Sequence, residues 1–397
     1  MTDNPSRRQL LKKGAAGISV LVVGGLVWRA WDNGVFSAGT GPAYEPWLDW
    51  QTEQADAPLS LIRAAILASN AHNTQPWLFR ATEGRIDIYA DLNRNLGAFD
   101  PYRRELFISL GCALENLVIA ASHAGLSADV TLIPGTLPPA PDSKSVLVAT
   151  VDLKPGAATR HALYDQIPHR HTNRGAYDPA GQIKPSVITA LEQEVSHPAL
   201  QMALFPRGQQ WAKLGGVIVN ATQQIVNDHV MAADSAKWFR FDWDDLQKHR
   251  DGVTLDAAGL PPLLNIGAKM IPSPSSETSD QQWLGATRDV HVATSAMLGM
   301  ILVNDLYGRE ASLIAGRAWQ RLHLKATALG LAVQPLNQPV EIVDREYDLG
   351  KPPLMAASLA QISGSIDWRP TFVFRLGYAE RPARPSPRRA VEDVVLT

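Results

Sequence analysis

Short amide side chains gather in residues 69–77, which read SNAHNTQPW. Asparagine and glutamine both donate and accept hydrogen bonds without carrying charge, which suits the edge of a neutral heterocyclic ligand. We therefore interpret the stretch as a ligand-binding loop, with Ser69, Asn70, Asn73 and Gln75 as its candidate site residues. The same residue types are common in an ordinary turn between a helix and a strand, and this alternative stays open.

A second stretch, PHRHTNRGAYD at residues 168–178, combines basic side chains with a hydroxyl group. Arg170 and Arg174 flank Thr172, and guanidinium groups bind phosphate through paired hydrogen bonds, so these three residues are candidates for an anion site. Two alternatives remain, a solvated basic loop and a zinc site. The zinc ligands would be His161, His169 and His171.

The elements on either side would hold the amide loop rigidly. Apolar residues in 58–68 recur with the spacing of an amphipathic helix, which we expect to end near Ser69. A buried strand should follow from Trp77, and the alternating residues 85–90 predict a second strand paired with it as a hairpin. A long helix is predicted from Glu105 to Ala124.

The chain contains an internal repeat. Residues 111–126 align without a gap to residues 316–331, and the coincident positions include Gly111 with Gly316. Residues 58–79 and 185–205 form a second pair, each a helix that opens with proline, a short break and an apolar strand, but the second copy lacks the amide cluster. We interpret this as a duplication that produced a fused pseudo-dimer with one surviving site. Chance similarity between two amphipathic helices is the alternative.

Composition excludes some classes of protein and favours others. The 397 residues are 45% hydrophobic and carry a formal charge of −2, so we expect a sizeable core and no nucleic-acid partner. The single cysteine, Cys112, lies in an apolar helical pattern and predicts a buried structural thiol.

The N-terminal residues look like a targeting segment. Arg7 and Arg8 precede the uncharged run Gly14–Trp28, and the arrangement resembles a twin-arginine export signal. This predicts partnership with the twin-arginine export machinery and a location in the periplasm or on the outer face of the inner membrane. The segment 1–38 is either removed or kept as a membrane anchor, because residues 35–37 form a mediocre cleavage site.

The amide loop and the stretch RHTNR together resemble the nitroreductase superfamily, and most closely its Acg-like branch, in which two nitroreductase halves are fused. The resemblance implies bound FMN, with Arg170, Thr172 and Arg174 gripping its phosphate, ribityl chain and pyrimidine edge. Asn70 and Asn73 would line the flavin.

Further roles follow from the same resemblance. Gln75 would brace the loop, and Ser69 stands where the family often has a proline. The resemblance places three residues beside the reactive nitrogen of the flavin and two candidates at its phosphate. These are Pro335, Leu336 and Asn337, and then Arg388 and Arg389.

Between the repeats, residues 235–282 resemble the lid insertion of the Acg-like branch. Trp238 and Trp243 make it aromatic enough to cover the flavin face, although a helical pair packing on the core would use the same aromatic residues. We therefore expect an α+β fold with a first half at 39–160 and a second half at 161–397 that carries the lid.

The function that the resemblance implies is an exported FMN-dependent oxidoreductase. Reducing equivalents from a donor, NAD(P)H in the usual case, would pass to a nitroaromatic, a quinone or a similar acceptor. A flavin-binding or flavin-sequestering protein without turnover is the alternative. No residue is assigned as a catalytic acid or base, no metal site is expected, and the chain is expected to be a monomer because it is its own pseudo-dimer.

Overall fold

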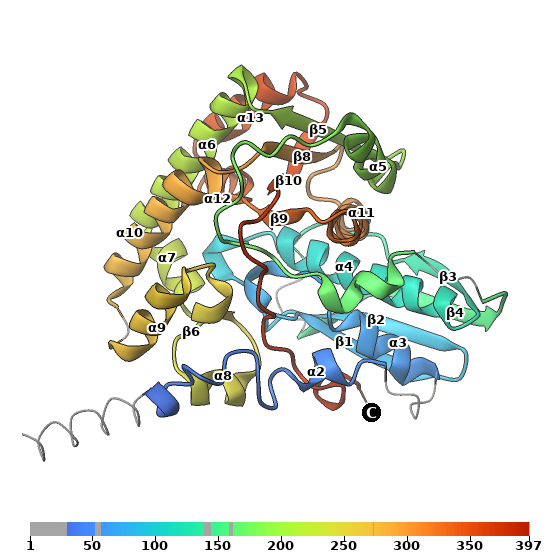
Figure 1. Cartoon of the computed structure of the whole chain (residues 1–397). Coiled ribbons are helices and arrows are strands. Elements are labelled where there is room, and N and C mark those ends of the chain that lie inside the picture. Colours follow the sequence, from blue (N-terminus) through green and yellow to red (C-terminus); the bar gives the residue numbers. More distant parts are fainter. Residues whose placement is uncertain (1–29, 52–56, 139–143, 159–161, 273, 397) are drawn as a thin grey trace, which may run out of the picture.

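The computed structural model describes residues 30–51, 57–138, 144–158, 162–272 and 274–396. The paired arginines and the apolar run Gly14–Trp28 lie outside these residues, so the export signal stays a prediction. The described chain forms two antiparallel sheets separated by a pair of long helices (Figure 1).

The first sheet belongs to the N-terminal part of the chain and has the strand order β1-β2-β4-β3. The predicted hairpin is confirmed, since β1 and β2 pair from Trp77 with Ala90 to Thr82 with Arg85. The predicted helices on either side are present. In chain order the elements are α2 (Glu45–Leu48), α3 (Ala57–Ala65), β1 (Trp77–Thr82), β2 (Arg85–Asp91), α4 (Arg104–His123), β3 (Leu126–Leu132) and β4 (Ser145–Pro155).

The second sheet repeats this design, because its strand order β5-β8-β10-β9 also places the first, second, fourth and third strands side by side. A helix again precedes the first strand, and a long helix again follows the second. The elements are α5 (Pro185–Val195), β5 (Leu200–Pro206), β8 (Met297–Val303), α11 (Arg309–Ala328), β9 (Ala332–Pro335), α12 (Gln338–Asp348), α13 (Leu354–Ser363) and β10 (Arg369–Gly377).

The two sheets differ in the connection between their first two strands. A tight turn around Gly84 joins β1 to β2, whereas residues 207–296 separate β5 from β8. This insertion forms the wall of helices on the left of Figure 1 and contains the predicted lid region, 235–282. Its elements are α6 (Gln209–Asn227), α7 (His229–Ala236), β6 (Phe239–Arg240), α8 (Trp243–His249), β7 (Val253–Thr254), α9 (Pro262–Met270) and α10 (Ser276–Ala286).

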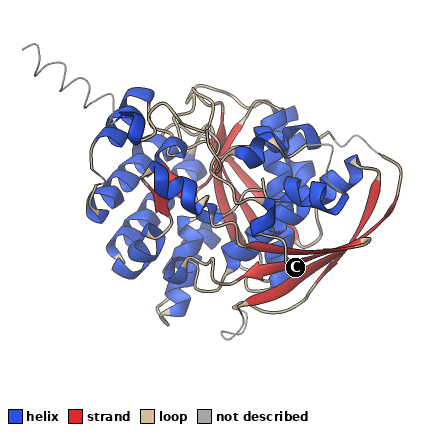
Figure 2. Cartoon of the chain, turned by 90° about the horizontal axis from the view of Figure 1, so that it is seen from below, coloured by secondary structure: helices blue, strands red, loops and turns tan. Residues whose placement is uncertain are grey.

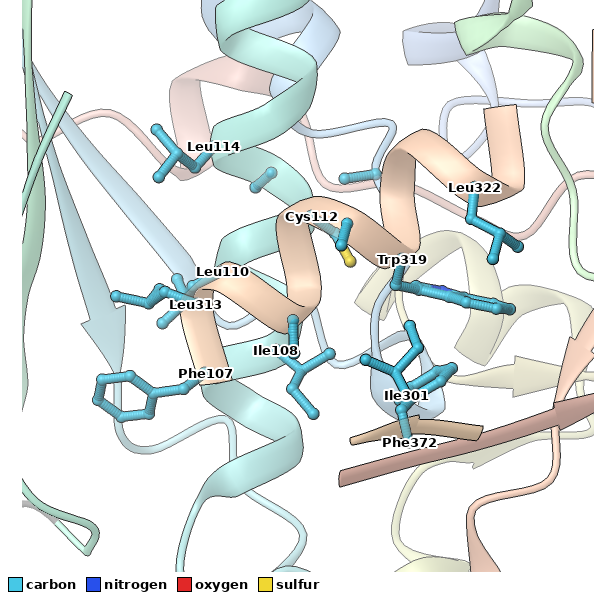
Figure 3. Close-up of a cluster of buried hydrophobic side chains, with 14 of the residues drawn as sticks. Phe107, Ile108, Leu110, Cys112, Leu114, Ile301, Leu313, Trp319, Leu322 and Phe372 are labelled. Atoms are coloured by element: carbon cyan, nitrogen blue, oxygen red, sulfur yellow. The ribbon is translucent and has the colours of Figure 1, made fainter. Parts of the chain in front are cut away.

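The core is built on the crossing of α4 and α11, the two helices aligned by the sequence repeat (Figure 3). The two helices approach each other closely at a glycine in each. A Cβ atom on Gly111 would lie 2.2 Å from the Leu313 carbonyl oxygen, and one on Gly316 would lie 2.0 Å from the Ile108 carbonyl oxygen, so neither position has room for a side chain. Cys112 is buried at the same crossing with its Sγ 3.2 Å from the Gly316 oxygen, which confirms the predicted structural thiol.

Helix α4 is long and apolar enough to span a membrane, the one such helix among the described residues, but 83% of its apolar stretch is buried inside the protein. Its buried side chains, including Phe107 and Ile108, belong to one hydrophobic cluster with Leu313 of α11 and Phe372 of the second sheet (Figure 3). Helix α4 is therefore a core helix of this fold.

Two segments cross between the two sheets. The C-terminal tail leaves β10 and returns to the first sheet, where the Phe79 N–H donates to the Val394 oxygen at 2.8 Å and the Leu396 N–H donates to the Phe79 oxygen at 2.7 Å. The chain end accordingly lies beside the strands of that sheet in Figure 2. In the opposite direction, the segment after β4 reaches the second sheet, where the Asp178 N–H donates to the Tyr378 oxygen at 2.7 Å.

Candidate functional site

The two crossing segments bring Arg170 and Arg388 to one end of α3. Helix α3 ends at Ala65, a few residues before the predicted end, and the turns that follow present the carbonyl groups of Leu67 and Ala68. Arg170 Nη2 donates to the Leu67 oxygen at 3.0 Å, and Arg388 Nη2 donates to the Ala68 oxygen at 3.1 Å. Both arginine side chains are buried.

This arginine pair lacks a counter-charge. Within the described parts of the chain, no carboxylate forms an ion pair with Arg170 or Arg388, and the Nε atom of each has no hydrogen-bond partner. Burial lowers the pKa of Arg170 to about 10, and burial followed by the charge of Arg170 lowers the pKa of Arg388 well below its usual value. Two buried cations with free donors form a site suited to a doubly charged anion such as a phosphate monoester.

Aromatic rings enclose the arginine pair. The Trp47 ring centroid lies 4.8 Å from Arg388 Cζ, and the His171 ring meets Trp47 edge-on at 4.6 Å. His323, from α11, places its Nδ1 3.4 Å from Arg170 Nη1. Burial first, and then the nearby arginines, lowers the pKa of His171 to about 3 and that of His323 well below 6.5, so both imidazoles are neutral.

The sequence did not single out Trp47 or His323 as site residues. The segment around Trp47 stood out only as the acidic and aromatic counterpart of the RHTNR stretch. His323 lies in the aligned repeat helix, but its spacing gave no sign that it would face Arg170.

The amide loop has a strained backbone. His72, Asn73 and Gln75 adopt φ angles of 47°, 55° and 51°, in the left-handed region that non-glycine residues seldom occupy. The Gln75 N–H donates to Asn70 Oδ1 at 2.8 Å, which closes the loop on itself. At its start, Ser69 Oγ accepts from Trp319 Nε1 at 3.2 Å. Strain of this kind persists where surrounding contacts fix the backbone, and here the C-terminal tail and the insertion supply them.

The amides of the loop bind the tail and the insertion in this structure. Asn73 Nδ2 donates to the Pro387 oxygen at 2.9 Å, and Asn73 Oδ1 accepts from Arg388 Nη1 at 2.6 Å. Gln75 Nε2 donates to the Arg250 oxygen at 2.8 Å, while Gln75 Oε1 accepts from the Arg389 N–H at 2.8 Å. Gln75 therefore braces the loop as predicted, and Asn73 connects the loop directly to the arginine pair.

Of the two C-terminal arginines, the structure places Arg388 beside Arg170. Arg389 instead donates through Nη1 to the Gln75 oxygen at 3.3 Å, so it supports the amide loop. Thr172 lies half-buried between Arg170 and Arg174 in the same crossing segment.

Residues 250–259 of the insertion, which we call the covering segment, lie on the predicted site. The Gly252 N–H donates to the Asn73 oxygen at 3.1 Å, and Arg174 Nη1 donates to the Ala257 oxygen at 3.1 Å. Gly259 packs so closely that a Cβ atom would lie 2.4 Å from the Arg174 carbonyl carbon. Nearby, His72 Nε2 is 3.0 Å from Ser235 Oγ, which fixes α7 to the amide loop.

The two tryptophans predicted to cover the flavin face have other partners. Trp238 donates through Nε1 to the Asn95 oxygen at 3.2 Å and lies over the Arg94 guanidinium, and Trp243 packs against Gly34. This matches the alternative in which the aromatic side chains serve packing. The backbone of residues 250–259 reaches the amide loop, and the Phe239 ring of the predicted lid lies 6.4 Å from the His72 ring.

The predicted segment Pro335-Leu336-Asn337 leaves the end of β9 and is held against β10 and α4. The Leu336 N–H donates to the Val373 oxygen at 2.8 Å, and Asn337 Oδ1 accepts from the Val373 N–H at 3.0 Å. Asn337 Nδ2 donates to the Glu105 carboxyl group. The Asn337 side chain and the Leu336 N–H are therefore both committed to contacts within the protein.

Buried acidic groups lie behind Asn337. Burial first, and then the Asp100 carboxylate, raises the pKa of Glu105 to about 7. Burial and the charge of Glu105 raise the pKa of Glu341 well above its usual value, and the two carboxyl groups are hydrogen-bonded to each other. The hydrogen bond between them adds to the rise at Glu341 but opposes it at Glu105, so the Glu105 shift comes from burial and from Asp100.

The amino-acid sequence is similar to that of known proteins over most of its length. No family model matches the chain. Over 374 residues the chain is 26% identical to the Mycobacterium tuberculosis H37Rv protein named "Putative NAD(P)H nitroreductase Rv3131", a match covering 90% of this chain and 95% of that protein. A second protein of that strain, "Putative NAD(P)H nitroreductase acg", is 29% identical over 100 residues, which are 25% of this chain and 28% of that protein.

Solved structures give weaker matches. The FMN-dependent nitroreductase NfnB from Mycobacterium smegmatis aligns with a TM-score of 0.38 and 13% identity, over 59% of this chain and 97% of that one. A protein from Anabaena variabilis described as a "putative nitroreductase" aligns with a TM-score of 0.47 and 10% identity, over 84% and 91%. Both TM-scores are low. The sequence matches support the predicted resemblance to the nitroreductase superfamily, including its Acg-like members.

Proposed function

We propose that the protein is an exported FMN-dependent oxidoreductase of the nitroreductase type. The observation that carries the proposal is the buried pair Arg170 and Arg388, which has free Nε donors and no acidic partner among the described residues. The phosphate of FMN has the charge and the acceptor oxygens that this pair requires. Sequence similarity to proteins named as NAD(P)H nitroreductases, over 90% of the chain, supports the same activity.

In this proposal the chain binds FMN from both halves. Arg170 and Arg388 would hold the phosphate, with Thr172 adding a hydroxyl group. Arg174, Asn73 and the backbone of residues 335–337 would line the ring, while the covering segment excludes water. When bound, FMN supplies the chemistry by which reducing equivalents pass from NAD(P)H to an acceptor such as a nitroaromatic or a quinone.

The two halves are best explained as a fused pseudo-dimer. Support comes from the matching strand orders, from the symmetric glycine contacts of α4 and α11, and from the reciprocal crossing segments. One complete site per chain follows, because the arginines and the amide loop each come from one half. We keep 39–160 and 161–397 as the proposed halves, with the tail of the second completing the first sheet.

Export is proposed from the sequence. Replacing Arg7 and Arg8 by lysine should leave the protein in the cytoplasm if the paired arginines address it to the twin-arginine machinery. Cell fractionation with an activity-independent tag measures the outcome. Unchanged export of the double variant would remove this part of the proposal without touching the flavin site.

A second function, flavin sequestration without turnover, is favoured by one observation. The covering segment contacts both Asn73 and Arg174, so the predicted ring site is closed in this structure. A closed site can hold a flavin that no second substrate reaches.

The test is to count FMN and then to measure its reactivity. Flavin released by denaturation should equal one per chain, and a count near two, or near zero after soaking with FMN, contradicts the proposed site. NADPH should bleach the bound flavin, and a nitroaromatic or quinone should restore its colour. Stoichiometric flavin that neither NADPH nor any acceptor affects would identify the sequestering protein instead.

A further inference from the structure

Helix α9 is amphipathic with its apolar side turned outward. None of its residues is buried. Its polar side chains face the protein: Asn265 Nδ2 donates to the Leu255 oxygen at 3.1 Å, and Lys269 Nζ lies 2.8 Å from Asp256 Oδ2. The large apolar side chains are exposed instead, and they are Leu263, Leu264, Ile266 and, just after the helix, Ile271. A surface helix of a soluble protein normally has the opposite orientation.

A second apolar surface adjoins this one. Trp31 and Phe36 are exposed on the first described segment of the chain. The segment is fixed to α9, because Asn33 Nδ2 donates to the Lys269 oxygen at 2.8 Å and Lys269 Nζ donates to the Gly34 oxygen at 3.1 Å. Figure 1 shows this start of the described chain beside α9 and α8, at one edge of the molecule. We call α9 with Ile271, Trp31 and Phe36 the apolar edge.

The preceding sequence indicates what covers the apolar edge. The uncharged apolar run Gly14–Trp28 ends three positions before Trp31, so any membrane that takes up this run lies next to the edge. Lys269 is the single charged residue in 260–272, and Asp256 neutralises it. Exposed leucine, isoleucine and aromatic side chains fit the boundary between lipid headgroups and acyl chains, and Asp32 is the one exposed charge between Trp31 and Phe36.

We propose that the apolar edge rests on a lipid bilayer and docks the insertion onto the membrane surface. A patch of this kind on a soluble monomer otherwise marks a protein interface or an aggregation hazard. Because α9 directly follows residues 250–259, docking places the covering segment of the predicted flavin site next to the membrane. The proposal concerns this surface and stands whether or not FMN binds.

Fluorescent labels on single cysteines test the proposal in the full chain. Cys112 is buried, so Leu263→Cys on α9, 82% exposed, gives a selective position. Leu354→Cys, 68% exposed, is the matched control, because it lies on α13, which Figure 1 shows at the opposite end of the molecule from α9. The parent protein measures background labelling. Both variants are reconstituted in phosphatidylcholine vesicles with and without nitroxide-bearing lipid.

The label at residue 263 should shift to shorter wavelength in vesicles and lose most of its emission to the nitroxide lipid, while the label at residue 354 should change little. Equal responses at the two positions would overturn the proposal. A blue-shifted label at 263 before vesicles are added would overturn it as well. A pyrene label at residue 263 would then distinguish the two remaining occupants of the apolar edge. Excimer emission would identify a second copy of the protein, and its absence would identify the chain's own N-terminal segment.

Discussion

Gly111 and Gly316 meet where α4 crosses α11: a Cβ atom added to Gly316 would lie 3.0 Å from the Gly111 Cα atom. The sequence repeat had aligned these two glycines, and the structure places them in contact with each other. The Cα atom of Gly111 faces the carbonyl oxygen of Leu313, three residues before Gly316. The Cα atom of Gly316 faces the carbonyl oxygen of Ile108, three residues before Gly111. Equivalent residues in equivalent contacts are what a twofold interface between like units produces.

Gly316→Ala should therefore destabilise the protein by about 1–3 kcal/mol, because the added methyl group has backbone atoms as neighbours and the helices must separate. Gly216→Ala is the matched control, since Gly216 lies in helix α6 with no atom within 4 Å of its added Cβ. That substitution should raise stability by up to about 1 kcal/mol through helix propensity. Urea unfolding of both variants measures the difference, and equal stability of the two would contradict the close crossing.

Arg170→Ala should weaken FMN binding about ten- to a hundredfold, because a charge-assisted phosphate contact contributes about 1.5–3 kcal/mol. His171→Ala should weaken it far less, since burial keeps that imidazole neutral. Titration of the apoproteins with FMN compares the two variants.

The stability of the apoproteins separates a ligand role from a structural one. If Arg170 only caps the end of α3, its removal should destabilise the apoprotein and leave FMN affinity at the parental value. If it binds phosphate, loss of one of two buried like charges should cost the apoprotein little. If the Arg170 and His171 variants bind FMN with equal affinity, residues 170–174 form a structural loop and do not bind phosphate.

Gly259→Ala should open the covering segment. Gly259 has a φ of 78°, and its added Cβ would lie 2.4 Å from the Arg174 carbonyl carbon, so the closed arrangement cannot accept the methyl group. Bound flavin should then be bleached faster by an added reductant. Gly285→Ala, in α10 with open space around it, should leave the rate unchanged.

Trp238→Ala and Trp243→Ala should change the bleaching rate less than Gly259→Ala, because the partners of the two rings are Asn95 and Arg94 for Trp238 and Gly34 for Trp243. A faster rate in these variants than in Gly259→Ala would assign the cover to the tryptophans after all. Faster bleaching on opening, combined with no turnover by the intact protein, would favour sequestration over catalysis.

Glu105→Gln should flatten part of the pH dependence of stability. The pKa of Glu105 is about 7 in the folded protein against 4.5 for a free side chain, so the folded state binds more protons between these values. Its contribution is fully present below pH 4.5 and is lost as the pH rises through 7. The neutral glutamine keeps an acceptor oxygen for Asn337 at every pH.

The stability of the variant relative to the parent should therefore rise by about 1–3 kcal/mol from pH 4.5 to pH 8. Taking the difference between the two proteins cancels the titration of groups that do not interact with Glu105, including the buried histidines, whose lowered pKa values act in the opposite direction. Unfolding curves at several pH values give this difference. A difference that stays constant with pH would show that Glu105 is ionised in the folded protein.

Local sequence patterns were sufficient for the elements and for the repeat. The apolar spacing of residues 105–124 and the alternation in 85–90 predict their helix and strand, because each pattern reports which side of a single element is buried. The alignment of Gly111 with Gly316 likewise follows from sequence alone, since close packing of two helices permits few residue types. The Arg170 stretch and the amide loop were recognised because their chemistry is local.

Only the tertiary structure decided which of these residues meet. Arg388, and not Arg389, lies beside Arg170, because the C-terminal tail crosses to the first sheet. Arg170 and Arg388 are more than two hundred residues apart in the sequence, so no local pattern predicts that they meet. Trp47 and His323 join the site for the same reason. Composition pointed to Trp238 and Trp243 as the cover, and only the tertiary structure shows that the glycine-bounded backbone of residues 252–259 fits closely against the amide loop and Arg174.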